Sequence, residues 1–114
     1  MMAKHLVVYI CNNGYATKAM DKARKAGARG GTILHGRSSL EASHQTFLGI
    51  TIHPEKDVLL IITDDLEKDS IIEAIHQNYG VTTDARGVLF TLEVDKTIGI
   101  DLKQTFKVKK DESI

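Results

Sequence analysis

Residues 58–79 read VLLIITDDLEKDSIIEAIHQNY, a stretch in which a strand pattern passes directly into a helix pattern. The first five residues are all apolar and rich in β-branched side chains, which is typical of a buried strand. Asp64 stands three residues before Glu67, the spacing of a helix N-cap and its reciprocal partner. Apolar residues then recur at helical spacing, at Ile71, Ile72, Ile75 and Tyr79. We predict a strand over residues 58–63 and a helix over residues 66–79.

The residues before this stretch hold a strand, a helix and a second strand. Residues 5–11, HLVVYIC, are rich in β-branched and aromatic side chains and end at the turn-forming sequence NNG. Residues 15–26 place four alanines and Met20 on one helical face and lysines on the other. Gly27 suits the left-handed position that follows a helix. Residues 32–37 are predicted to form a weaker strand, because Gly36 interrupts it.

The residues after the second helix complete the fold. Gly80 ends the helix, residues 81–87 form a loop, and residues 88–94, VLFTLEV, alternate as a strand does. The alternation places four apolar side chains on one face: Val88, Phe90, Leu92 and Val94. The order βαββαβ predicts an α+β, ferredoxin-like domain over residues 1–114, with both helices on one face of an antiparallel sheet. Residues 97–102 are a candidate edge strand, and the charged tail 103–114 is expected to fray.

Two of the predicted strands are apolar on both faces. Residues 58–62 are apolar at every position and residues 6–11 nearly so, as in strands buried on both sides. Two helices cover only one face of such a sheet, so the other face needs a second cover. We expect another copy of the chain to supply it. The alternative is that this face is an exposed apolar patch.

Composition excludes several classes of function. Lys plus Arg and Asp plus Glu number 15 each, so no net charge attracts nucleic acid or an anionic membrane. The apolar runs are too short to insert into a membrane, and no signal peptide is recognisable, so we expect a cytoplasmic protein. The single Cys11 is interpreted as a small buried hydrophobe. The histidines are too scattered for a zinc pattern and no catalytic triad is recognisable, which argues against an enzyme.

The glycines in residues 27–39, GARGGTILHGRSS, have two interpretations. Glycines before and within a strand let a ligand approach the backbone, and successive free amides can cradle an anion. Alternatively, Gly30 and Gly31 only form the turn after the helix, and Gly36 is a bulge. Residues 38–54 show no sustained period, and a long excursion of this kind is usually functional or disordered.

Three features together resemble the PII nitrogen-regulatory signal-transduction family: GARGGTIL at residues 27–34, the long loop before an all-apolar strand, and DARGVLFTLEV at residues 84–94. The resemblance spans residues 4 to 102. It implies a homotrimer with clefts between subunits that bind adenine nucleotides. It also implies that residues 38–54 are a T-loop that docks onto an ammonium transporter, an enzyme or a transcription factor. Residues 81–87 match the B-loop, and the end of the chain matches the C-loop.

The resemblance assigns roles to particular residues. It implies that one subunit contributes Thr32, Gly36 and Arg37 to the cleft, and that a neighbouring subunit contributes Arg86 and Gly87. Gly30 joins this set through its free backbone amide. The partner-contacting residues of the loop are Ser38, Ser39, Ser43, His44 and Phe47.

The chain also departs from the family pattern. Typical members carry a lysine and two arginines at the positions of Val88, Gly99 and Asp101. Without these cations we predict weak binding of ATP, and comparable or better binding of a less charged ligand such as AMP, while the effector itself stays unknown. The alternative is a trimeric ferredoxin-like protein that binds metal ions or another small ligand, in the manner of the divalent-cation tolerance proteins.

Overall fold

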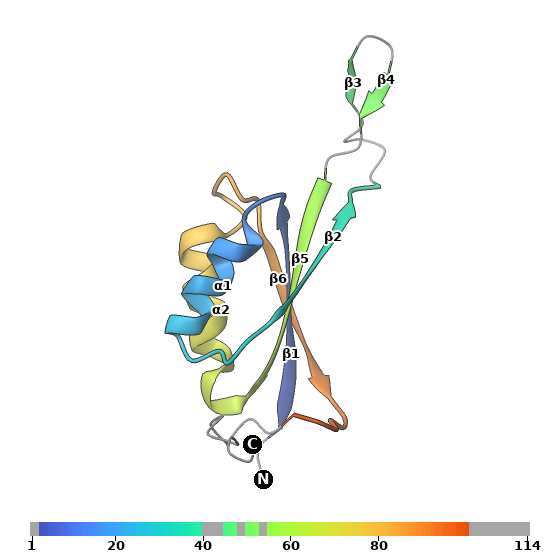
Figure 1. The fold of residues 1–114 in the computed structure, drawn as a ribbon. Helices are drawn as coiled ribbons and strands as arrows, with labels where there is room; N and C mark the ends of the chain where they lie inside the picture. The colour runs from blue at the N-terminus through green and yellow to red at the C-terminus, as the bar shows by residue number, and fades with distance from the viewer. Residues whose placement is uncertain (1–2, 40–44, 48–49, 53–54, 101–114) are drawn as a thin grey trace, which may run out of the picture.

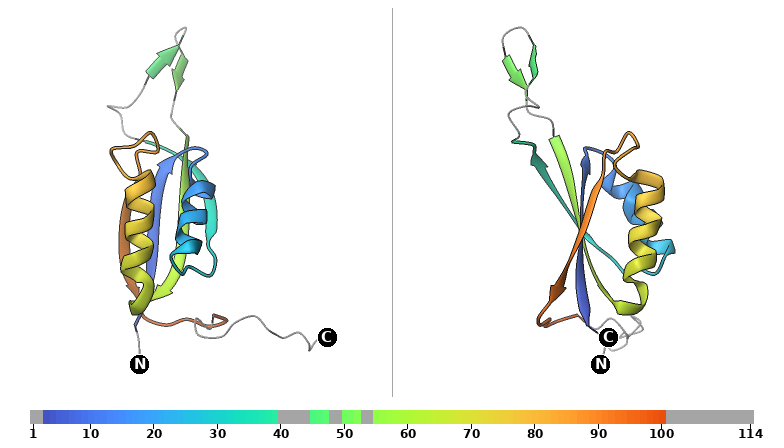
Figure 2. Two further views of the ribbon diagram at one scale, coloured as in Figure 1. Left: turned by 90° about the vertical axis from the view of Figure 1, so that its left-hand side faces the viewer. Right: turned by 180° about the vertical axis from the view of Figure 1, so that it is seen from behind.

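The computed structural model describes residues 3–39, 45–47, 50–52 and 55–100. Its elements are, in chain order, β1 (Lys4–Asn12), α1 (Ala16–Lys25), β2 (Thr32–Arg37), β3 (Gln45–Phe47), β4 (Ile50–Ile52), β5 (Glu55–Asp64), α2 (Asp65–Tyr79) and β6 (Val88–Val94). Four strands form one antiparallel sheet in the order β2-β5-β1-β6, and both helices cover one face of it (Figures 1 and 2). The predicted βαββαβ ferredoxin-like fold is confirmed.

The core lies between the sheet and the helix layer. Alternate residues of β1 and β5 face the helices and are fully buried: Val7, Tyr9, Cys11, Leu59 and Ile61. Helix α2 contributes Ile71 and Ile75, whereas α1 contributes a stripe of small side chains that lets it pack close to the sheet. Cys11 is a buried thiol, as predicted.

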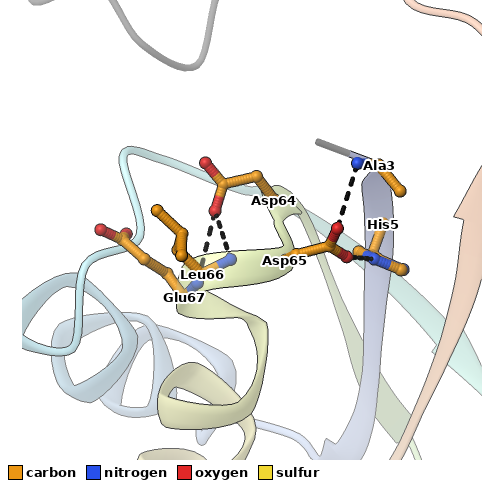
Figure 3. A network of polar contacts seen from close by, with 6 residues as sticks. All are labelled: Ala3, His5, Asp64, Asp65, Leu66 and Glu67. Carbon is orange, nitrogen blue, oxygen red and sulfur yellow. Dashed lines mark hydrogen bonds and ion pairs between the residues drawn. The ribbon is translucent and has the colours of Figure 1, made fainter. Parts of the chain in front are cut away.

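The helix ends follow from the residues that flank them. Gly27, just after α1, has a φ of 117°, the left-handed conformation predicted for it. The Asp64 carboxylate accepts hydrogen bonds from the amides of Leu66 and Glu67 at 3.0 and 3.3 Å, so the predicted N-cap is confirmed (Figure 3). The Glu67 carboxylate does not turn back to Asp64, because it packs against Gly27, which has no side chain to exclude it.

A second polar contact joins the start of β1 to the start of α2. His5 Nε2 lies 2.5 Å from Asp65 Oδ1, and the Ala3 amide donates to Asp65 Oδ2 at 3.2 Å (Figure 3). The hydrogen bond from His5, followed by that from Ala3, lowers the pKa of the Asp65 carboxyl. These contacts hold the start of β1 against the start of α2.

Residues 38–54, predicted to be a long excursion, include a regular hairpin of β3 and β4, in which Phe47 pairs with Ile50; strands of three residues are too short to show a period. Two interpretations of local structure were wrong. Gly36 forms no bulge, because β2 pairs with β5 in continuous register from Thr32 to Arg37. Residues 97–100 form no strand, since the chain bends at Gly99, whose φ is 92°; residues 101 and 102 lie outside the described part.

Candidate functional site

The face of the sheet that points away from the helices is apolar. The register aligns Ile10 with Val58 and Val88, and two further rows of the same kind lie beside it. One of these rows holds Val8, Leu60 and Phe90, and the other holds Leu6, Ile62 and Leu92. Nothing in the described part of the chain covers this face, and on β6 the side chains of Val88, Phe90 and Leu92 are 51%, 45% and 53% exposed. We call this surface the open face.

The predicted ligand residues fall into three separate places. Gly36 and Arg37 end β2, and Arg86 and Gly87 precede β6, at the same end of the sheet (Figure 1). However, β2 and β6 are opposite edges of the sheet, so about 14 Å of sheet separates the two pairs at 4.8 Å per strand. Thr32 begins β2, about 13 Å along the strand from Gly36, and Gly30 lies two residues before β2. One chain alone does not bring these residues together.

The glycine at position 87 is explained by packing. Gly87 is buried, and an added Cβ would collide with the Tyr9 ring and with the carbonyl oxygen of Tyr79. The Tyr9 hydroxyl donates to that same carbonyl at 2.8 Å, and burial raises the pKa of Tyr9, which keeps the hydroxyl protonated. Arg86, beside it, is exposed and has a φ of 50°, an uncommon conformation for a residue with a side chain.

The glycines around β2 differ from one another. Gly31 makes a close approach, because an added Cβ would lie 2.9 Å from Met20 Sδ and 3.0 Å from Leu59 Cδ1. Gly30 and Gly36 have no atom within 4 Å of the same position. Open space therefore adjoins the backbone at Gly30 and at Gly36, as it does at Gly14 and Gly99, and binding of a ligand there stays a prediction.

The partner-contacting residues predicted in the loop are only partly described. Ser38 is half-buried and Ser39 is exposed, directly after β2. Phe47 is the last residue of β3, whereas Ser43 and His44 lie outside the described residues. The β3–β4 hairpin projects beyond the ends of β2 and β5 (Figure 1).

The structure also shows a buried carboxylate that the sequence analysis missed. Asp57 is 3% exposed and accepts hydrogen bonds from the Gly14 amide at 2.9 Å, Asn13 Nδ2 at 3.2 Å and the Ala16 amide at 3.5 Å. His35 Nδ1, at 2.9 Å, is its fourth partner. Asp57 thus accepts hydrogen bonds from backbone amides at the start of α1, where the helix's own N-cap residue makes no side-chain hydrogen bond. The sequence did carry a signal for its burial. Asp57 stands two residues before Leu59, so the alternation of β5 places both side chains on the helix-covered face.

The environment of Asp57 keeps it ionised. Burial by itself raises the pKa of this carboxyl, but the hydrogen bonds from the Gly14 amide, the His35 ring and the Ala16 amide outweigh it. The pKa therefore lies below its usual value.

Lys56, on the opposite side of β5, was also missed. Its Nζ donates to Asn12 Oδ1 at 2.9 Å, while Asn12 Nδ2 donates to the Asp84 carbonyl oxygen at 2.9 Å. The Asn12 backbone amide further donates to the carbonyl oxygen of Ala85 at 2.8 Å. Lys56 is therefore connected through Asn12 to the loop that carries Arg86.

The described residues form neither a metal site nor a membrane-spanning helix. No group of three or more His, Cys, Asp and Glu side chains in this part of the chain is placed to hold a metal ion. None of its helices is both long enough and apolar enough to cross a membrane.

The sequence matches no known protein-family model, and no curated protein matches it at a significant level. Solved structures do match its fold. The GlnK–ATP complex of B. subtilis has a TM-score of 0.61 and 17% identity, over 84% of this chain and 85% of that one. Arabidopsis thaliana PII bound to citrate has a TM-score of 0.57 and 18% identity, over 80% and 74%. CutA from Synechococcus elongatus has a TM-score of 0.59 and 9% identity, over 82% and 79%.

These similarities agree with the fold described above, a ferredoxin-like α+β domain with two helices on one face of a four-stranded sheet. Within that class the architecture is PII-like, and the low identities make the chain a divergent example of it.

Proposed function

We propose that the chain is a PII-like nitrogen-regulatory signalling protein of the cytoplasm. In this proposal it assembles as a homotrimer, binds a small effector in the clefts between copies, and regulates a partner protein through residues 38–54. It catalyses no reaction of its own. The open face is the observation that carries the proposal.

The open face supports assembly because soluble monomers rarely expose a large contiguous apolar surface. Its edge strand β6 alone exposes about half of Val88, Phe90 and Leu92. Burying one such side chain completely is worth about 1.5–3 kcal/mol, so covering several of them stabilises an oligomer substantially. The described residues offer no cover, and a second copy presents a matching apolar surface.

The two edges of the sheet support an effector site between copies. In the proposed ring each contact joins two different surfaces of identical subunits, and we place the β2 edge of one copy against the β6 edge of the next. Gly36 and Arg37 at the end of one edge then meet Arg86 at the start of the other, and this joins the two pairs that a single chain keeps apart.

The residues in this cleft favour a ligand with few negative charges. GlnK has been solved with ATP, but this chain carries Val88, Gly99 and Asp101 where the family pattern has cations. An adenine nucleotide such as AMP needs fewer charge-assisted hydrogen bonds than ATP does, so we propose that AMP binds at least as well.

The position of the hairpin supports a role in partner binding. Strands β3 and β4 stand clear of the helix layer and of the main sheet, where another protein can reach them (Figures 1 and 2). We propose that residues 38–54, including Ser38, Ser39, Ser43, His44 and Phe47, contact the partner. An ammonium transporter, an enzyme or a transcription factor is the class of partner that the PII resemblance implies.

Sedimentation and calorimetry test this function together. The proposal predicts a trimer at micromolar concentration that binds an adenine nucleotide. Binding of divalent metal ions without any nucleotide binding would instead favour the alternative function, a trimeric metal-binding protein with a fold similar to that of CutA. A folded monomer that binds none of these ligands would contradict both.

A further inference from the structure

Lys56 carries a positive charge that no described carboxylate neutralises. It is half-buried on the open face, and none of the ion pairs between described residues includes it. The Asp57 carboxylate, next in sequence, is turned to the other side of the sheet and engaged by Gly14 and His35. An ammonium group donates three hydrogen bonds, and Asn12 accepts one of them. A partly buried cation in this state is a favourable position for an anion.

Asn12 holds the ammonium group in place. Its side-chain nitrogen donates to the Asp84 carbonyl oxygen, so its side-chain oxygen must face Lys56. Its backbone amide is fixed to Ala85 as well. Because these contacts exist before any ligand arrives, little side-chain freedom is lost when one binds.

The surroundings of Lys56 combine free space with an apolar floor. Its register partner on β2 is Gly36, which has no atom within 4 Å of the place where a Cβ would stand. The next row of the open face is entirely apolar: Leu34, Val58, Ile10 and Val88. A flat apolar group can lie against the margin of this row, where the area covered by the neighbouring copy ends at the cleft, while an attached anion reaches the ammonium group.

We propose that Lys56 is the anion-contacting residue of an effector site at this end of the open face. The ligand class is a small molecule with a flat apolar body and one oxyanion group, either a phosphate monoester or a carboxylate. One lysine matches one such group better than a triphosphate. This inference deepens the proposed function and rests on it, since a neighbouring copy completes the cleft.

Calorimetry with AMP and adenosine isolates the anion contact, because the two ligands differ only in the phosphate. For the wild type we expect AMP to bind roughly 10- to 100-fold more tightly than adenosine, the effect of one charge-assisted hydrogen bond. Lys56→Gln should remove most of this difference and leave the adenosine affinity unchanged. Lys56→Arg, which keeps the charge, should retain most of it.

Lys96→Gln is the matched control, because Lys96 lies beyond the end of β6, at the opposite end of the sheet. It removes the same charge and should leave the preference for AMP intact. Circular dichroism of each variant should match that of the wild type. If Lys56→Gln does not fold, Asn12→Ala releases the ammonium group without removing it and should weaken AMP binding.

Citrate and inorganic phosphate distinguish the two sources of the oxyanion. Citrate binding that Lys56→Gln removes, without AMP binding, assigns a carboxylate ligand to the same site. The inference is overturned if the preference for AMP survives Lys56→Gln, or if the wild type binds neither AMP, phosphate nor citrate. A trimer whose nucleotide binding ignores Lys56→Gln would overturn this inference alone, whereas a monomer without binding would overturn the proposed function too.

Discussion

The two faces of the sheet have similar side chains and different surroundings. On β5, Leu59 and Ile61 face the helices and are fully buried, whereas Leu60 and Ile62, between and beside them, belong to the open face and remain partly accessible. Both faces are apolar, yet the described chain covers only one of them. A strand that is apolar at every position therefore indicates that both faces of the sheet are covered, and the cover of the second face need not come from the same chain.

Ile61→Glu should have the largest effect, because it introduces a carboxylate into the helix-covered face. Ile61 is fully buried in a cluster of apolar side chains, which offer no partner for the new charge. Burying an unpaired charge costs several kcal/mol, a large part of the total stability of about 5–15 kcal/mol for a small domain. We expect loss of the folded far-UV circular dichroism spectrum. A variant that unfolds at the wild-type temperature would contradict this assignment of the two faces.

Gly87→Ala should have the next largest effect, since Gly87 lies against the Tyr9 ring on the same covered face. Forcing a methyl group into this contact should cost about 1–3 kcal/mol of unfolding free energy, measured by urea denaturation. Gly36→Ala is the matched control, because Gly36 adjoins open space and should change stability by less than about 0.5 kcal/mol. Equal effects at the two positions would mean that the contact with Tyr9 is not the reason for Gly87.

Asp57→Asn should reduce stability in a pH-dependent way. The folded-state pKa of Asp57 lies below its unfolded value, so the carboxylate stabilises the fold fully above about pH 4 and loses this effect as the pH falls through the folded pKa. Replacing a charged acceptor should cost about 1–3 kcal/mol at pH 7. The difference from the wild type should shrink below pH 4. Urea denaturation at pH 7 and pH 3 measures it, and a constant difference would argue against a role for the charge.

The sequence predicted those parts of the fold that depend on neighbouring residues. The bounds of β2 and β6, the Asp64 cap and the left-handed Gly27 all follow from patterns within a few positions. The β3–β4 hairpin was missed because its strands hold three residues each. An edge strand was expected at residues 97–102 because this segment contains apolar residues. Residues 97–100 form no strand, since the chain bends at Gly99.

The site was less predictable, because its contacts join residues far apart in the sequence. Asp57 meets Gly14 and His35, and Lys56 meets Asn12, through the pairing of β5 with β1 and β2. Local spacing carries no information about such partners. Gly87 was assigned to a ligand cleft by resemblance, whereas the structure gives it a packing partner in Tyr9; the cleft itself stays a prediction.

Leu60→Glu should have the smallest effect on the folding of the single chain and the largest on assembly. Leu60 lies one position from Ile61 but on the open face, so the new carboxylate can reach water in a monomer. Sedimentation equilibrium at micromolar concentration, with circular dichroism as the control for folding, tests this difference directly. We predict three times the chain mass for the wild type and one chain mass for folded Leu60→Glu. A wild-type protein that is folded and monomeric would contradict the claim that a second copy covers the open face.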